Sequence, residues 1–302
     1  MQPRILDGKA LAGDLRERIK SAVRTMSAEG LVPGLATVLV GNNPASVSYV
    51  RSKHRTSEEV GIRTIDVTLP EECSAEQLSD AVAELNERSD VHGILIQQPL
   101  PAHLDAEVHV AAVAPAKDVD GFHPENLGRL MRGRRCMVPC TPLGVVHMLA
   151  AGGISTRGAN VVIVGRSMLV GKPLASLLMQ KNDTGNATVT VCHSATRDLP
   201  EHTRNADIVV AAIGVPGYVT ADMVQEGAVV IDVGINRVDD SSRRRGYRIV
   251  GDVDYENVAP KTSAITPVPG GVGPMTVVML MYNTVQAARG AYSQDPLTGE
   301  QQ

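Results

Sequence analysis

Tyr49 and Lys53 are the first side chains along the chain whose types and spacing could do chemistry. They lie four residues apart in a segment of helical pattern, residues 45–60, so both project from one face, one turn apart. A phenol ring can stack on a flat ligand, and a lysine amine can act as a general acid or base. The same spacing is more often a tyrosine that packs on the lysine stem, so the pair needs further polar partners before it predicts a site.

Two further polar residues could be those partners. Gln97 directly follows a predicted strand, and ligands of open parallel sheets bind beyond the carboxyl ends of the strands. Asp120 belongs to a long irregular stretch, residues 97–140, and long loops usually carry function. Asp118, Asp120 and His123 could also suggest a metal. Two or three hard ligands without a fixed geometry more often form a loop network, so we predict no metal site.

A second candidate site is the segment VGRSMLVGKP, residues 164–173, which joins a predicted strand to a predicted helix. Backbone N–H groups and the dipole at a helix N-terminus bind phosphate, and Gly165 and Gly171 would let the backbone come close to it. The segment departs from the dinucleotide fingerprint GxGxxG because position 167 is Ser, and it departs from the Walker loop as well. Taken alone, it is equally consistent with a purely structural turn.

The end of the next predicted strand favours NADP over NAD. Enzymes that use NAD usually place a carboxylate there to bind the ribose 2′-hydroxyl, whereas this strand ends in Val191-Cys192-His193-Ser194. Arg166 and Ser194 could supply a cation and a hydroxyl to a 2′-phosphate, although Arg166 could also be a surface salt-bridge partner.

These residues must be positioned by two series in which strand and helix patterns alternate, which predicts parallel strands joined by helical crossovers. The strands are expected at residues 35–40, 62–69 and 92–96, then at 160–164, 187–192, 207–213 and 228–233. The helices are expected at residues 45–60, 74–87, 141–151, 172–182 and 275–289, and the last should pack back toward the first series. The charged segment 239–247 is predicted to be a solvated loop.

The bulk composition limits the class of protein. A chain of 302 residues with 43% hydrophobic residues can bury the cores of about two domains. The net charge of -4, with basic residues scattered among acidic ones, argues against a nucleic-acid partner. The four cysteines form no CxxC pair and are expected to be reduced thiols. Without an apolar leader or a membrane span, we expect a cytoplasmic protein with no membrane partner.

Eight motifs in order give a more specific indication than any one of them. They are SYVRSK (48–53), GILIQQPLP (93–101), KDVDGFHPENLGRL (117–130), CTPLGVV (140–146), VGRSMLVGKP (164–173), VIDVGINR (230–237), GDVDYENV (251–258) and TPVPGGVGPMT (266–276). Together they closely resemble the methylenetetrahydrofolate dehydrogenase/cyclohydrolase family, from about residue 5 to residue 289. The resemblance implies an α/β fold of two domains. Residues 1–140 and 270–302 would form a folate-binding catalytic domain, and residues 141–269 a Rossmann-like NADP-binding domain.

The resemblance also implies roles for individual residues. Tyr49 would stack on the aminobenzoyl ring of the folate, and Lys53 would be the general acid/base of the hydrolytic step. Gln97 would orient Lys53, and the Asp120 carboxylate would pair with N–H groups of the pterin. The backbone wall near the reacting carbon would be Pro269, Gly270, Gly271, Val272 and Gly273. The NADP ligands would be Gly165, Arg166, Ser167, Gly171, Ser194 and Ile235.

The implied activity is oxidation of 5,10-methylenetetrahydrofolate by NADP, followed by hydrolysis of the methenyl product to 10-formyltetrahydrofolate. Relatives in the family are commonly homodimers. Two other hypotheses stay open: another NADP-dependent dehydrogenase, of the amino-acid or shikimate type, and a nucleotide-responsive binding module without catalysis. One residue departs from the family pattern, because Gln98 stands where Leu usually follows the catalytic Gln, and its amide could alter contacts with the pterin.

Overall fold

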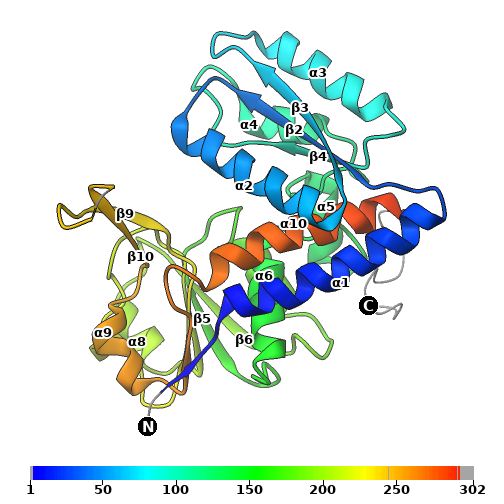
Figure 1. The fold of residues 1–302 in the computed structure, drawn as a ribbon. Helices are drawn as coiled ribbons and strands as arrows, with labels where there is room; N and C mark the ends of the chain where they lie inside the picture. Colours follow the sequence, from blue (N-terminus) through cyan, green and yellow to red (C-terminus); the bar gives the residue numbers. More distant parts are fainter. Residues whose placement is uncertain (1–2, 244, 291, 293–302) are drawn as a thin grey trace. The chain divides into compact units, whose positions relative to one another are not determined.

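The structure, a computed structural model, describes residues 3–243, 245–290 and 292 (Figure 1). It divides into two units, each with its own sheet. Of the described residues, 13–140, 277–290 and 292 form the first unit, and 3–12, 141–243 and 245–276 form the second. Residues 3–12 and 270–276, which were predicted to belong to the folate-binding domain, therefore pack with the second unit. The predicted α/β class, with parallel sheets and a C-terminal helix, is confirmed.

The first unit is built on a three-stranded parallel sheet in the order β3-β2-β4. Its strands are β2 (Gly34–Val40), β3 (Arg63–Leu69) and β4 (Gly93–Ile96), within one residue of the predicted bounds. Helix α2 (Pro44–Val60) and helix α3 (Ala75–Glu87) join them and lie on opposite faces of the sheet (Figure 1). The Ser74 hydroxyl and the Gln77 side chain form a capping box that starts α3.

Alternation along β2 explains how the sheet holds a helix on each face. Ala36 and Val38 point into the core that Leu78 and Val82 of α3 complete. Thr37 points to the other face, where its hydroxyl lies 3.4 Å from the His54 ring of α2. A strand buried on both faces reads as a continuous apolar run, which is why β2 was predictable from sequence.

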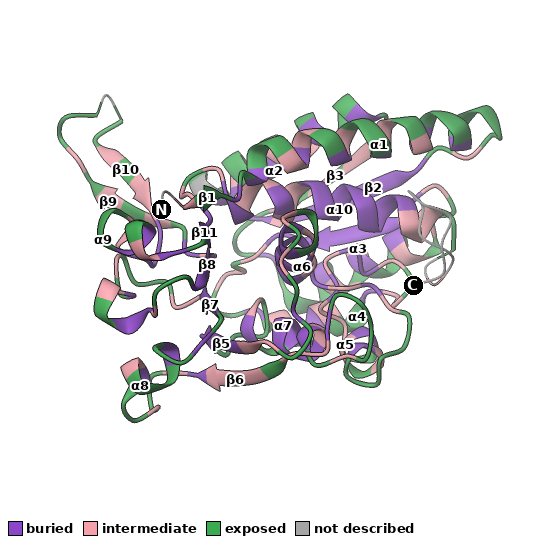
Figure 2. Cartoon of the chain, turned by 90° about the horizontal axis from the view of Figure 1, so that it is seen from below, coloured by how far each residue is buried: buried purple, intermediate pink, exposed green. Residues whose placement is uncertain are grey.

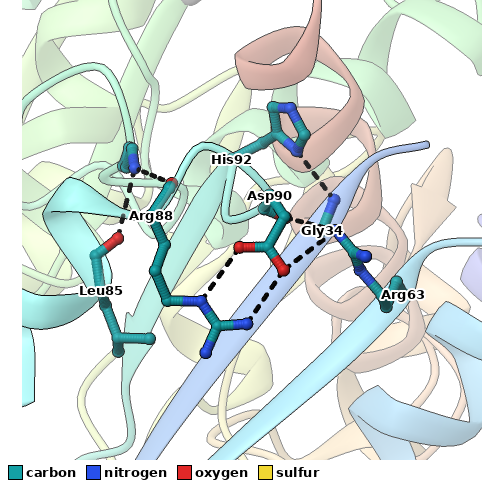
Figure 3. A network of polar contacts seen from close by, with 7 residues as sticks. Gly34, Arg63, Leu85, Arg88, Asp90 and His92 are labelled. Atoms are coloured by element: carbon teal, nitrogen blue, oxygen red, sulfur yellow. Dashed lines mark hydrogen bonds and ion pairs between the residues drawn. The ribbon is translucent and has the colours of Figure 1, made fainter. Parts of the chain in front are cut away.

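A polar network lies at the amino-terminal ends of these strands (Figure 3). Gln97 lies at their carboxyl ends. Arg88 donates two hydrogen bonds, of 3.0 and 2.9 Å, to the Asp90 carboxylate, and Arg63 donates to the Asp90 backbone carbonyl. The Arg88 hydrogen bonds lower the pKa of Asp90 to about 2. The Gly34 N–H donates to Nδ1 of His92, so the network joins the starts of β2 and β4 to the end of α3.

Two long helices complete the first unit. Helix α1 (Gly8–Ala28) was missed in the sequence analysis, although Leu15, Ile19 and Val23 recur at helical spacing and are buried. Helix α10 (Val272–Ala288) was predicted, and its residues 278–285 are all buried (Figure 2). Its Asn283 bonds to backbone carbonyls of the first unit, so the expected return of the C-terminal helix to that unit is confirmed.

The stretch between β4 and residue 140 is less irregular than predicted. It contains helix α4 (Ala106–Ala112) and helix α5 (Pro124–Met131), each opened by a side-chain cap. Asp105 caps the first, and His123 caps the second ahead of Pro124. Both helices are too short to show a clear apolar period in the sequence.

The second unit is a six-stranded parallel sheet in the order β1-β11-β8-β7-β5-β6. Four strands were predicted: β5 (Asn160–Val164), β6 (Thr188–Cys192), β7 (Ile208–Ala211) and β8 (Val229–Asp232). Two were not, β1 (Arg4–Ile5) and β11 (Ala264–Ile265), because two residues carry no readable pattern. The hairpin of β9 (Asn236–Asp239) and β10 (Tyr247–Val250) flanks the predicted loop.

The helices of the second unit are mostly short. They are α6 (Cys140–Ala151), α7 (Gly171–Leu178), α8 (Leu199–Thr203), α9 (Tyr255–Val258), and the 3-10 turns η1 (Ala221–Met223) and η2 (Ala259–Lys261). The prediction of a helix to residue 182 was wrong, since α7 ends four residues earlier. The Asn182 side chain accepts the N–H of Thr184 at 3.1 Å, a local turn that competes with the helix. Among the described residues, none of the helices combines the length and apolar character of a membrane span.

Candidate active site

Lys53 and Gln97 form the centre of the candidate site in the first unit. The Lys53 ammonium on α2 donates a 3.0 Å hydrogen bond to Oε1 of Gln97, which directly follows β4. The Gln97 amide in turn donates to the Gln98 carbonyl at 2.6 Å, and its residue is only 9% exposed. Because its N–H₂ end is engaged there, the amide oxygen faces the lysine. The structure therefore brings together two residues that are 44 positions apart in sequence.

Asp120 is half-buried, and it is close enough to Lys53 for the positive charge of the lysine to lower its pKa. Burial raises the pKa of the Asp120 carboxyl to about 6, and the nearby Asp118 adds to this rise. The Lys53 charge and a hydrogen bond from the Cys140 thiol oppose it. Asp120 therefore has a pKa close to neutral pH and interacts with the charge of a lysine. Such perturbed pKa values are typical of functional sites.

Asp118, two residues earlier, has a structural role. Its carboxylate accepts N–H groups of Gly121, Phe122 and His123 at 3.1, 3.2 and 2.8 Å. It also accepts the amide of Asn126 at 2.9 Å, so it organises the loop that presents Asp120. Within residues 3–243, 245–290 and 292, the structure has no group of three His, Cys, Asp or Glu side chains that could hold a metal.

Tyr49 lies one turn before Lys53 on α2 and is 49% exposed, which leaves its ring accessible to a ligand. Gln98, the next residue after Gln97, lies in a bend beyond the end of β4. There it lines a small cavity together with Asp118, Asp120 and Phe122 and apolar residues of β4 and α4. The residue that departs from the family pattern therefore shares a cavity with Asp120.

In the second unit, the turn after β5 is shaped by two glycines. Gly165 has a φ of +134°, and a Cβ there would collide with the Ala212 carbonyl oxygen. A Cβ on Gly171, the first residue of α7, would collide with the Gly165 carbonyl oxygen. The Ser167 hydroxyl accepts the N–H of Val170 at 3.1 Å and braces the turn. Only glycine allows the strand end and the helix start to approach so closely.

The exposed polar side chains around this turn fit the phosphates of a dinucleotide. Arg166 and Ser167 are exposed on the turn itself. After β6, His193 donates its backbone N–H to Thr196 at 2.8 Å and its ring accepts the N–H of Ala195, while Ser194 is exposed. No carboxylate stands at this strand end, so the donor set would accept a negatively charged ribose substituent.

Two buried carboxylates that the sequence analysis missed hold the loops after β7 and β8. Asp252 accepts the N–H groups of Ile213 and Gly214 at 2.6 and 2.9 Å, and the Asn236 amide at 2.8 Å. Asp232 accepts the N–H of Asp252 at 2.9 Å, and burial raises its pKa to about 6. They fix the loop in which the predicted cofactor residue Ile235 is 50% exposed.

The predicted backbone wall, residues 269–273, also lies in the second unit. The Gly270 carbonyl accepts the N–H of Lys9 at 2.9 Å. A Cβ on Gly271 would stand 2.6 Å from the Pro267 carbonyl oxygen, so this residue must be glycine. Pro269 is exposed and Val272 is buried at the start of α10. The position of a Cβ on Gly273 lies 3.5 Å from Cδ1 of Ile235, so the predicted wall lies beside the residue predicted to contact the cofactor.

Comparisons with known proteins show which enzymes the chain is similar to. The tetrahydrofolate dehydrogenase/cyclohydrolase catalytic domain matches residues 6–120, and the NAD(P)-binding domain of the same enzymes matches residues 139–292. The bifunctional protein FolD of Halobacterium salinarum is 57% identical over 284 residues, 94% of this chain and 95% of that protein. The FolD methylenetetrahydrofolate dehydrogenase/cyclohydrolase structure from Campylobacter jejuni is 45% identical with a TM-score of 0.89, covering 94% and 98%. The Trypanosoma brucei FolD structure, complexed with NADP cofactor and inhibitor, is 39% identical with a TM-score of 0.90, covering 96% and 98%.

Proposed function

The chain belongs to the tetrahydrofolate dehydrogenase/cyclohydrolase family, and we propose that it performs both reactions of that family with the residues described above. It oxidises 5,10-methylenetetrahydrofolate to 5,10-methenyltetrahydrofolate with a nicotinamide cofactor, and hydrolyses the product to 10-formyltetrahydrofolate. A dehydrogenase of the amino-acid or shikimate type is not favoured, because the catalytic-domain match and the relatives together span nearly the whole chain.

Folate binding and cofactor binding divide between the two parts of the chain in this proposal. Residues 1–140 and 270–302 supply the folate-binding side chains, and residues 141–269 hold the cofactor. The match of the catalytic-domain model to residues 6–120 and of the NAD(P)-binding model to residues 139–292 supports a division near residue 140, but the second model also includes residues 270–292, which the proposal gives to the folate-binding part. The resemblance alone supports a homodimer.

The observation that carries the hydrolytic role is the 3.0 Å hydrogen bond from Lys53 to Gln97. Water attacks the methenyl carbon, the neutral amine form of Lys53 takes a proton from the attacking water, and the resulting ammonium returns it to the departing ring nitrogen as the ring opens. Gln97 holds the lysine amine in one direction, and Tyr49 stacks on the aminobenzoyl ring. The Asp120 carboxylate accepts N–H groups of the pterin, a match that fixes the ring against the lysine.

For the cofactor, we propose NADP. When bound, its nicotinamide accepts the hydride from the methylene carbon. The glycine-lined turn at Gly165 and Gly171 admits the pyrophosphate, while Arg166 and Ser194 bind the 2′-phosphate. The absence of a carboxylate after β6 supports this choice.

The deciding experiment is the substitution Lys53→Met. We expect methenyl hydrolysis to fall by about 100-fold or more, because a general acid/base typically contributes that much. Arg55→Met is the matched control, since Arg55 lies on the same helix with a mostly exposed side chain. It should keep both activities, and thermal unfolding should show both variants folded. Native-rate hydrolysis by folded Lys53→Met protein would refute the role of Lys53.

A further inference from the structure

Asn283 is a buried amide in an otherwise apolar stretch of α10. It is 2% exposed, and its Nδ2 donates to the Val119 carbonyl at 2.8 Å and to the Val138 carbonyl at 2.9 Å. An amide has two N–H groups, so both are used. One acceptor directly precedes Asp120, and the other lies two residues before Cys140. The side chain therefore ties two separate backbone segments together.

These two segments, residues 118–121 and 138–140, also meet elsewhere. A Cβ on Gly121 would stand 2.5 Å from the Val138 carbonyl carbon and from the Pro139 nitrogen, so the backbones are in direct contact. The Cys140 thiol donates a 3.4 Å hydrogen bond to the Val119 carbonyl, accepts a hydrogen bond from the Asn283 amide at 3.6 Å, and is close enough to the Asp120 carboxylate to lower its pKa. Both the backbone and the side chain of Asp120 thus depend on how these segments are joined.

We propose that Asn283 is a positioning residue for Asp120: its amide clamps residues 118–121 onto residues 138–140 and so holds the carboxylate beside Lys53 and Cys140. This inference rests on the proposed role of Asp120 in binding the pterin. Replacing the amide by an apolar group of similar size leaves two buried carbonyls without their donor. The loop then relaxes, and the carboxylate loses its fixed direction.

A purely structural role for Asn283 makes a different prediction, and Thr284 supplies the matched control. Thr284 is the next residue of α10, is 0% exposed, and donates its hydroxyl to the Leu280 carbonyl at 2.8 Å within the helix. Thr284→Val removes this buried hydrogen bond without changing a contact of residues 118–121. It reports what loss of helix stability alone does to the kinetics.

The experiment compares Asn283→Leu, Asn283→Ser, Thr284→Val and Asp120→Asn in the full-length enzyme. KM for methylenetetrahydrofolate and KM for the cofactor are measured well below each unfolding temperature. We expect Asn283→Leu to raise the folate KM by tenfold or more and to leave the cofactor KM within twofold of the wild type. Asn283→Ser, which keeps one hydrogen-bond donor, should raise the folate KM by less. If Asn283→Leu does not fold, Asn283→Ser is the variant that tests the positioning role. Thr284→Val should leave both values within twofold.

The pH profile of kcat/KM for the folate gives a second readout. Asp120 is faced by Lys53 of α2, by Asp118 of its own loop and by Cys140 at the start of α6. Burial is the largest cause of the raised pKa of Asp120, and Lys53 and Cys140 oppose it, so a carboxylate that leaves its fixed position loses the contributions that set this pKa. The acid limb of the profile should therefore shift in Asn283→Leu and stay in place in Thr284→Val.

Two outcomes would overturn the inference. If both Asn283 variants behave like Thr284→Val while Asp120→Asn raises the folate KM, the positioning role is wrong and the proposed function stands. If Asp120→Asn also leaves the folate KM unchanged, the pterin-binding role of Asp120 fails, and the positioning role fails with it.

Discussion

At the scale of single residues, the proposed preference for NADP rests on Arg166. We expect Arg166→Ser to raise KM for NADP by roughly tenfold to a hundredfold, because a hydrogen bond to a charged group contributes about 1.5–3 kcal/mol. KM for NAD, which has no 2′-phosphate, should stay within about twofold. Arg157→Ser is the control, since Arg157 is also an exposed arginine of the second unit. An equal rise in KM for NADP and KM for NAD would show that Arg166 does not contact the 2′-phosphate.

Single residues also show how far the sequence could predict the site. The contact between Lys53 and Gln97 was implied by the family resemblance; their positions in the sequence, on a helix after a predicted strand and at the end of another strand, only made it possible. Asn283, Asp232 and Asp252 were missed, because a polar residue in an apolar segment gives no sign of its partner. The only signal was polarity itself, as Asn283-Thr284 interrupts the apolar run of residues 277–285. Most of their partners are backbone N–H and C=O groups, and because every residue has a backbone, the sequence does not show which residues these are.

At the scale of secondary-structure elements, the turn from β5 to α7 depends on the size of Gly171. We expect Gly171→Ala to lower the free energy of unfolding by about 1–3 kcal/mol, the usual cost of overpacking, because its Cβ would collide with the Gly165 carbonyl. Cofactor affinity should fall as well. Gly13→Ala on α1 is the matched control, because nothing lies within 4 Å of its Cβ. That change should stabilise the protein by about 0.5–1 kcal/mol. Chemical denaturation measures both, and similar effects of the two substitutions would contradict the packing argument.

The elements that were predicted and those that were missed differ in length and in environment. Strands buried on both faces, such as β5 and β7, read as apolar runs and were predicted within two residues. The two-residue strands β1 and β11 exist only because a neighbouring strand extends the sheet to them. Helix α1 carried a readable period, so its omission was an error of interpretation and not a lack of signal.

At the scale of the whole molecule, both units contain acids that burial makes costly to ionise. Burial raises the pKa of Asp118 and Asp120 in the first unit and of Asp232 in the second, and for Asp120 and Asp232 the pKa rises from 3.8 to about 6. Between pH 3.8 and about pH 6, Asp120 and Asp232 hold more protons in the folded protein than in the unfolded chain. Their contribution to the free energy of unfolding therefore falls as pH rises through this range. At about pH 6 each of these two carboxyls is half protonated in the folded protein, so the loss is nearly complete by about pH 7, and for each of Asp120 and Asp232 it is at most about 3 kcal/mol.

Asp120→Asn should therefore stabilise the protein in a pH-dependent way. At pH 4 the wild-type carboxyl is mostly neutral and resembles the amide, so the two unfolding temperatures should nearly agree. At pH 7.5 the variant should unfold at a temperature several degrees higher, because it avoids a buried charge. Asp90→Asn is the control, since the pKa of Asp90 is lowered to about 2 by Arg88 and its stabilisation is lost only below about pH 4. Its difference from the wild type should be the same at pH 5 and pH 7.5. Thermal unfolding by circular dichroism measures both series, and a constant difference for Asp120→Asn across this range would mean that Asp120 is ionised in the folded enzyme without cost.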